Sequence, residues 1–165
     1  MMVEILALAA FAGLLLYAAG SDIARLIIPN WVSIALVAIF PVAAFAHGLG
    51  AYDIGMHLLF GAAMLAVGFF LFAANIFGGG DAKLIAAAAV WTGFQGFFAL
   101  LFWTATAGGL LALALLAARH FIKTAETNPP FMNHLLQKQN GIPYGVAIMA
   151  GGLMAIPMMP FVLAR

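Results

Sequence analysis

The sequence contains no cysteine and very few charged residues. Without cysteine among its 165 residues, disulfides, thiolate metal sites and cysteine nucleophiles are excluded. Charged residues make up 7% of the chain, whereas a soluble domain carries about 25%. So few charges cannot cover a water-facing surface, and 67% of the residues are hydrophobic. The composition therefore predicts a protein whose main solvent is the lipid bilayer.

Several classes of functional site are also missing. The net charge is only +1 and no basic run occurs, so we expect no nucleic-acid partner. The four histidines show no metal-ligand spacing, and there is neither a His-Glu-x-x-His nor a Gly-x-Ser-x-Gly motif. Serine occurs only at Ser21 and Ser33, which leaves little room for a rhomboid-like serine site. We therefore expect no metal ion and no other cofactor.

Six apolar stretches come close to the roughly 20 residues that a membrane-spanning helix needs. They cover residues 3–19, 31–46, 54–77, 82–93, 94–118 and 142–163. The fourth is short, which tilt, local thinning of the bilayer or burial among neighbouring helices would explain. We expect the first to be an uncleaved helix, because its N-terminal region carries Glu4 and no Lys or Arg. The sequence thus predicts an all-α membrane protein, a bundle of six transmembrane helices forming one domain over residues 1–165.

The basic residues give this bundle an orientation. With six spans, the connections 20–30, 78–83 and 119–141 lie on one side of the membrane. That side holds Arg25, Lys83, Arg119, Lys123 and Lys138, and the other side holds only Arg165. The positive-inside rule makes the basic side cytoplasmic. We therefore expect an inner-membrane protein with both termini in the periplasm.

Acidic residues next to hydrocarbon are costly, so each one needs a reason. Asp22 closely follows the first apolar stretch, where it is either an interfacial turn residue or a functional carboxylate. A carboxylate at the end of a helix opposes the helix dipole, and Arg25 could offset that cost. Asp53 is expected to cap the third helix, while Glu126 is expected to be solvated in the long loop.

Asp81 follows three consecutive glycines, Gly78, Gly79 and Gly80, and precedes an apolar helix. The simplest reading is a helix N-cap, a role that Asp favours. Capping alone does not require three glycines, because such a run is entropically costly and usually marks close backbone approach or unusual dihedral angles. Lys83 is near enough in the sequence to hold a negative charge in place.

Asp22 and Asp81 are expected on the same side of the membrane, which suggests a pair of catalytic carboxyls. Two close carboxylates do not both ionise easily, so one keeps its proton. The ionised group can take a proton from water while the protonated one polarises a carbonyl. Such a pair hydrolyses a peptide without a metal or a covalent intermediate. The pairing requires the first and fourth helices to pack together.

Three motifs carry a resemblance to a known family. Residues 21–30 (SDIARLIIPN) resemble the first aspartate motif of the type IV prepilin leader peptidase family, with its Ile-Pro-Asn turn at Pro29 and Asn30. Residues 78–84 (GGGDAKL) resemble its second motif, Gly-x-Gly-Asp followed by x-Lys. The stretch 142–148 is similar to the signature that opens the family's last helix, here Pro143, Tyr144 and Gly145. The second motif alone would also fit presenilin-like proteases, but the three together cover nearly the whole chain.

The resemblance implies a GxGD-type intramembrane aspartyl protease that removes the short basic leader from prepilins and pseudopilins. Cleavage would occur at the cytoplasmic membrane face, ahead of the apolar pilin helix. Asp22 and Asp81 would be the catalytic pair, and the glycines at 78–80 would shape the active-site loop. The implied partners are the prepilin or pseudopilin, the lipid bilayer and the pilus assembly machinery.

One feature departs from the long, bifunctional members of that family. These have an additional N-terminal region with a cytoplasmic cysteine-rich segment, and they also N-methylate the new pilin N-terminus. Here the first helix begins at once and cysteine is absent. We therefore expect a peptidase without methyltransferase activity, similar to the short enzymes of tight-adherence (Flp) pilus systems.

A non-enzymatic alternative is a small transporter or a scaffold subunit of a secretion apparatus, because acids in membranes also serve as proton relays. A transporter is expected to place ionisable groups near the middle of the bilayer. In this sequence the acids lie at the ends of the apolar stretches, which favours the peptidase.

Overall fold

The computed structural model describes residues 2–122, 129–137 and 141–159. Within these ranges the chain forms helices and no strands. They are α1 (Met2–Arg25), α2 (Asn30–Ala46), α3 (Ala51–Ala73), α4 (Gly79–Phe121), α5 (Pro130–Leu136) and α6 (Tyr144–Ala155), and a short 3₁₀ turn at Ile156–Met158 follows α6. Helices α1, α3 and α4 are long and apolar enough to cross a membrane, while α2 and the stretch Tyr144–Met158 are shorter apolar helices. The all-helical prediction is confirmed for the described part of the chain.

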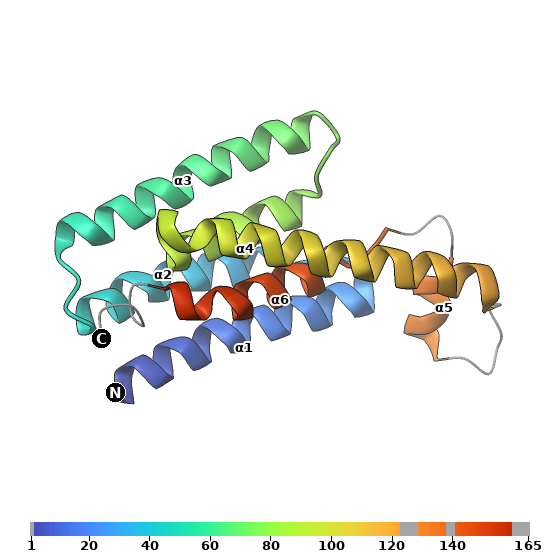
Figure 1. Ribbon diagram of the computed structural model, residues 1–165, viewed down its shortest axis with the longest axis horizontal. Helices are drawn as coiled ribbons and strands as arrows, with labels where there is room; N and C mark the ends of the chain where they lie inside the picture. The colour runs from blue at the N-terminus through green and yellow to red at the C-terminus, as the bar shows by residue number, and fades with distance from the viewer. Residues whose placement is uncertain (1, 123–128, 138–140, 160–165) are drawn as a thin grey trace.

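Helix α4 is broken at Gly93, which has φ 59° and ψ −173°. This backbone conformation is essentially confined to glycine. Figure 1 shows that the half before Gly93 and the half after it run in opposite directions. The break coincides with the predicted boundary between the stretches 82–93 and 94–118. It also frees the carbonyl of Val90, which lies 2.7 Å from Nδ1 of His57.

The half of α4 before Gly93 lies at the centre of the bundle. Leu84 and every residue from 86 to 93 are buried. Trp91 is fully buried, its indole nitrogen donates to the carbonyl of Leu36 at 2.9 Å, and its ring lies 5.1 Å from that of Phe11. Of the explanations for the shortness of the predicted fourth helix, burial among neighbouring helices is therefore the one that the structure supports.

The region 119–141, predicted as a loop, contains α5, and α4 extends to Phe121. Arg119 holds this region together: its guanidinium donates to the carbonyls of Leu135 at 2.9 Å and of Gly141 at 3.1 Å. The predicted capping role of Asp53 is wrong, because the N-cap of α3 is Gly50 and Asp53 lies in the first turn. Lys123, Glu126, Lys138, Arg165 and the predicted helical residues 160–163 lie outside the described residues.

The connections of the bundle separate into two ends. The α1–α2 connection, the α3–α4 connection and the start of α6 lie at one end, toward the right of Figure 1. The N-terminus, the α2–α3 connection and the Gly93 break lie at the other. Helix α6 packs against both α1 and α4. Three segments far apart in the sequence therefore meet at the end that carries Asp22 and Asp81.

Candidate active site

Asp22 lies in the last turn of α1 and is only 6% exposed. Its Oδ2 accepts a hydrogen bond from the backbone N–H of Gly145, at the start of α6, at 2.7 Å. A Cβ at position 145 would lie 3.0 Å from both Cβ and Oδ2 of Asp22, so any side chain at this position would crowd the carboxyl. The structure thus joins the first aspartate motif to the Pro-Tyr-Gly motif. A solvated turn residue would need neither this burial nor this partner.

The chain after Asp22 is held in a specific turn. Leu26 adopts φ 53°, an uncommon value for a bulky residue, and its N–H donates to the carbonyl of Asp22 at 2.8 Å. The Ser21 hydroxyl donates to the carbonyl of Ile27 at 2.8 Å. These bonds end α1 and direct the chain toward Pro29, the N-cap residue of α2. The backbone that carries Asp22 is therefore fixed by local structure.

Asp81 is half-buried in the first turn of α4, three residues after the N-cap Gly78. It is not the N-cap, and the N-cap position carries no side-chain hydrogen bond, so the capping interpretation of Asp81 is wrong. None of the three preceding glycines has a positive φ. Instead, a Cβ at Gly80 would lie 3.2 Å from Cβ of Ile28. The glycine run therefore allows a close approach to the α1–α2 turn, one of the two explanations that the sequence offered.

Both carboxyls line one cavity of about 460 Å³. Asp81 and Asp22 interact electrostatically across it. The rest of the lining comes from the α1–α2 turn, the glycine run and the segment before α6: Leu26, Ile27, Ile28, Asn30, Gly78, Gly79, Gly80, Gly141 and Ile142. We call this the aspartate cavity. The expected direct packing of the first and fourth helices is largely mediated by α6, which contacts both.

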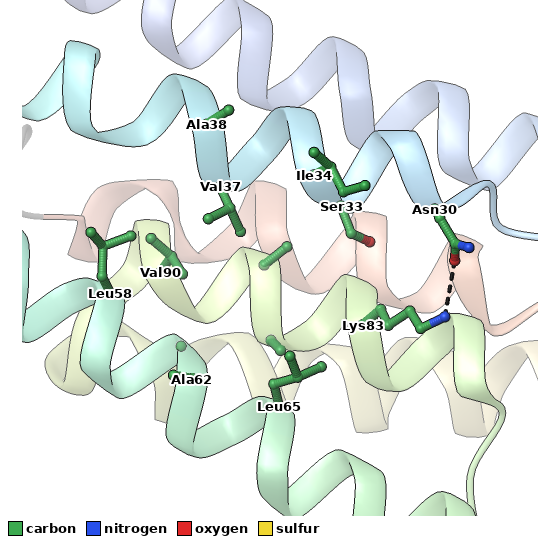
Figure 2. Close-up of a pocket in the computed structure, with 13 residues that line it drawn as sticks. Asn30, Ser33, Ile34, Val37, Ala38, Leu58, Ala62, Leu65, Lys83 and Val90 are labelled. Atoms are coloured by element: carbon green, nitrogen blue, oxygen red, sulfur yellow. Dashed lines mark hydrogen bonds between the residues drawn. The ribbon is translucent and has the colours of Figure 1, made fainter.

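Lys83 and Asn30 connect the two aspartate motifs on the outside of the site. The Lys83 Nζ donates to Oδ1 of Asn30 at 3.0 Å, as Figure 2 shows. The interaction that the structure records for Lys83 is thus with a neutral amide rather than with a carboxylate. It fixes the start of α2, where Asn30 lines the aspartate cavity, to the first turns of α4.

Replacing Lys83 or Asn30 by alanine is expected to lower the rate of the peptide hydrolysis that the sequence predicts for this site by about fivefold, because one hydrogen bond contributes about 1 kcal/mol. The double variant is expected to lose no more than either single variant, since both remove the same bond. Steady-state kinetics on the purified proteins measure this. Arg25→Ala removes a nearby exposed charge without breaking that bond and is the control. If the double variant instead lost the product of the two single losses, Lys83 and Asn30 would affect the rate independently and not through their shared hydrogen bond.

Sequence reasoning missed several residues that shape this site. Ser21 and Arg119 hold its walls through backbone carbonyls, and Ile142 forms part of the lining. The position of Arg119 at the end of a long apolar stretch indicated a residue with a specific role. The carbonyls that it binds, those of Leu135 and Gly141, could not be inferred from the sequence. Among the described residues, no three His, Cys, Asp or Glu side chains gather where they could hold a metal ion.

A sequence model of the type IV leader peptidase family matches residues 9–113, well over half of the chain. The chain belongs to the type IV leader peptidase family. It is therefore a prepilin peptidase, an aspartic protease, and its apolar helices make it a multi-pass membrane protein. The matched stretch contains Asp22 and Asp81 and ends before Gly145. No curated protein and no solved structure matches the chain.

Proposed function

We propose that Asp22 and Asp81 are the catalytic pair of this prepilin peptidase. The observation that carries the proposal is the aspartate cavity, which two of the chain's five acidic residues line together at the end of an apolar bundle. Hydrocarbon is a costly environment for carboxyls, so two of them in one cavity need a function. Co-expression of the enzyme with its prepilin, with the leader followed by immunoblot, tests the assignment.

The chemistry follows from two carboxyls that share one proton. The ionised carboxylate removes a proton from a water molecule, whose oxygen attacks the carbonyl carbon of the scissile peptide. The protonated carboxyl donates a hydrogen bond to the carbonyl oxygen and stabilises the charge that develops there. Collapse of the tetrahedral intermediate breaks the C–N bond, and the leaving nitrogen takes up a proton from the pair. The N–H of Gly145 orients the carboxyl of Asp22 throughout.

The remaining motif residues position this pair. Gly78, Gly79 and Gly80 form one wall of the aspartate cavity, and Asn30 forms another. Pro29 and Pro143 are the N-cap residues of α2 and α6, so each fixes the entry of a helix next to the site. Tyr144 packs over Gly108 of α4, where a Cβ would lie 2.9 Å from its ring. This contact anchors the segment that presents Gly145.

The proposed setting is the bacterial inner membrane, with α1, α2, α3, the two halves of α4 and α6 as six spans of one GxGD-type domain. The aspartate cavity then faces the cytoplasm, because Arg25, Lys83 and Arg119 lie at its end of the bundle. Both termini would face the periplasm. Labelling of single cysteines placed in the α1–α2 and α2–α3 connections with an impermeant reagent tests this orientation.

The proposed substrates are Flp-type prepilins and pseudopilins, cut after their short basic leader, and the pilus assembly machinery is the proposed destination of the product. We expect no N-methylation of the mature pilin. Mass spectrometry of the new pilin N-terminus distinguishes an unmodified amine from a methylated one, and Flp-type and other prepilins can be compared as substrates in the same cells.

The cleavage rate of the purified enzyme is expected to fall at both ends of the pH range. A pair that shares one proton is inactive when both carboxyls are protonated and when both are ionised, so each limb approaches a tenfold change per pH unit. The profile is measured as kcat/KM on a peptide substrate. Asp53→Asn, at the other end of the bundle, is expected to leave the profile unchanged. A flat profile with chemistry rate-limiting would contradict the shared proton.

A further inference from the structure

A second, larger cavity of about 660 Å³ lies next to the aspartate cavity, between α2, α3 and the first half of α4. Figure 2 shows its walls, which include Val37 of α2, Leu65 of α3 and Val90 of α4. We call it the lateral groove. It exists because α3 packs on α4 and touches α2 much less. The only buried residues of α3 are Gly61 and Gly68, so most of this helix faces lipid or the groove.

The lateral groove adjoins the proposed active site. Asn30 lines both cavities, and Lys83, at the same end of the groove, is two residues from Asp81. Along α4 the groove reaches from Lys83 to Val90, which corresponds to about 10 Å of helix. A chain that leaves the aspartate cavity past Asn30, toward the membrane interior, would meet the groove, whose length corresponds to about two helical turns.

The lining also matches an apolar helix. The floor consists of small residues, among them Gly61, Ala62 and Ala86, which let another backbone approach closely. The polar residues of the lining are Asn30 and Lys83 at one end and Ser33, whose side chain points from α2 toward α4 in Figure 2. Ser33 is 8% exposed, and among the described residues its hydroxyl has no hydrogen-bond partner. The first turn of a docked helix carries N–H groups without partners, and the enclosed hydroxyl could accept a hydrogen bond from one of them after rotating toward the groove.

We infer that the lateral groove binds the first two turns of the substrate's apolar helix, directly after the bond that is cut. The inference rests on the proposed function, because it places the scissile bond in the aspartate cavity. The groove holds the helix while its N-terminal end reaches Asp22 and Asp81. A lipid acyl chain would suit the apolar walls, but only the substrate has to pass from the groove into the aspartate cavity.

Cross-linking tests this inference cleanly because the chain has no native cysteine. Ala62 lines the groove, whereas Ala63, the next residue of α3, is exposed and does not. Ala62→Cys and Ala63→Cys are each combined with Asp81→Asn and co-expressed with a prepilin that carries one cysteine in the second turn of its apolar helix. We expect Ala62→Cys to cross-link at least about fivefold more than Ala63→Cys, because successive helix positions face different directions.

A functional measurement supports the same comparison in the active enzyme. Ala62→Trp fills the groove and is expected to lower kcat/KM for the prepilin by about tenfold, while Ala63→Trp leaves it unchanged. Circular dichroism and thermal unfolding of both variants show whether the bundle is intact. If Ala62→Trp does not fold, the cysteine pair decides the question alone.

Equal cross-linking from positions 62 and 63 would overturn the inference, as would a phospholipid that stays bound at Ala62 while the substrate cross-links elsewhere. In both cases, if the wild type cleaves normally and Asp81→Asn does not cleave, the proposed catalytic function is still supported. If Asp81→Asn still cleaves, the catalytic assignment fails instead. The cross-links are then compared on the cleaved product, which retains its apolar helix.

Discussion

Replacing either Asp22 or Asp81 by asparagine is expected to abolish leader cleavage, with a fall in rate of at least about 100-fold. Asparagine keeps the size of the side chain but cannot exchange a proton with water or with the scissile amide. Since the two carboxyls face one cavity, each single substitution should be as damaging as the other. The rate is measured with purified enzyme and prepilin by following the appearance of the mature band on a gel.

Asp53→Asn is the matched control, since Asp53 lies in the first turn of α3 at the opposite end of the bundle. It removes one carboxyl without touching the aspartate cavity and should cleave at the wild-type rate. Thermal unfolding of all three variants separates lost chemistry from lost structure. Wild-type cleavage by folded Asp22→Asn or Asp81→Asn would remove that residue from the mechanism.

The second large effect is expected for Gly145→Val, which should lower cleavage by more than about tenfold while the bundle stays folded. Even a Cβ at this position would lie 3.0 Å from Oδ2 of Asp22, so the larger side chain must displace the carboxyl that the Gly145 N–H holds. A misplacement of about 1 Å at a catalytic group can reduce the rate about 100-fold. Gly145→Ala should lie between wild type and Gly145→Val in kcat.

Gly20→Ala provides the control for adding a side chain near the site, because a Cβ at Gly20 meets nothing within 4 Å. It should keep full activity, and the gain in helix propensity should raise the stability of α1 slightly. If Gly145→Val cleaved as fast as Gly20→Ala, the hydrogen bond from Gly145 to Asp22 would have no part in catalysis.

Much of the helix pattern could be predicted because each apolar stretch is bounded by a recognisable signal. The Gly93 break lies at the expected boundary between the stretches 82–93 and 94–118, where Thr92, Gly93 and Gln95 interrupt an otherwise continuous apolar run. Helix α5 was missed because Pro129 and Pro130 indicated a loop, although proline is also favoured in the first turn of a helix. The capping role of Asp53 failed because Asp stabilises the first helical turn as well as the N-cap.

The candidate site was predictable in its residue types but not in its contacts. Asp22 and Asp81 stood out because acids are rare in this chain and each lies in a motif. The partner of Asp22 could not be inferred, since Gly145 is 123 residues away and glycine offers no side-chain signal. The bond between Lys83 and Asn30 was equally hidden, because it depends on how α2 and α4 cross.

The central claim is that the carboxyls at positions 22 and 81 work together in one cavity. Its most direct test is intramolecular cross-linking of the double variant Asp22→Cys/Asp81→Cys with a short bis-maleimide, read out by mass spectrometry of the linked peptides. The cysteine-free chain gives a clean background, and Asp22→Cys/Asp53→Cys, with one residue at each end of the bundle, is the comparison. The account predicts an efficient link between positions 22 and 81 and none between 22 and 53. No link between positions 22 and 81 would contradict it.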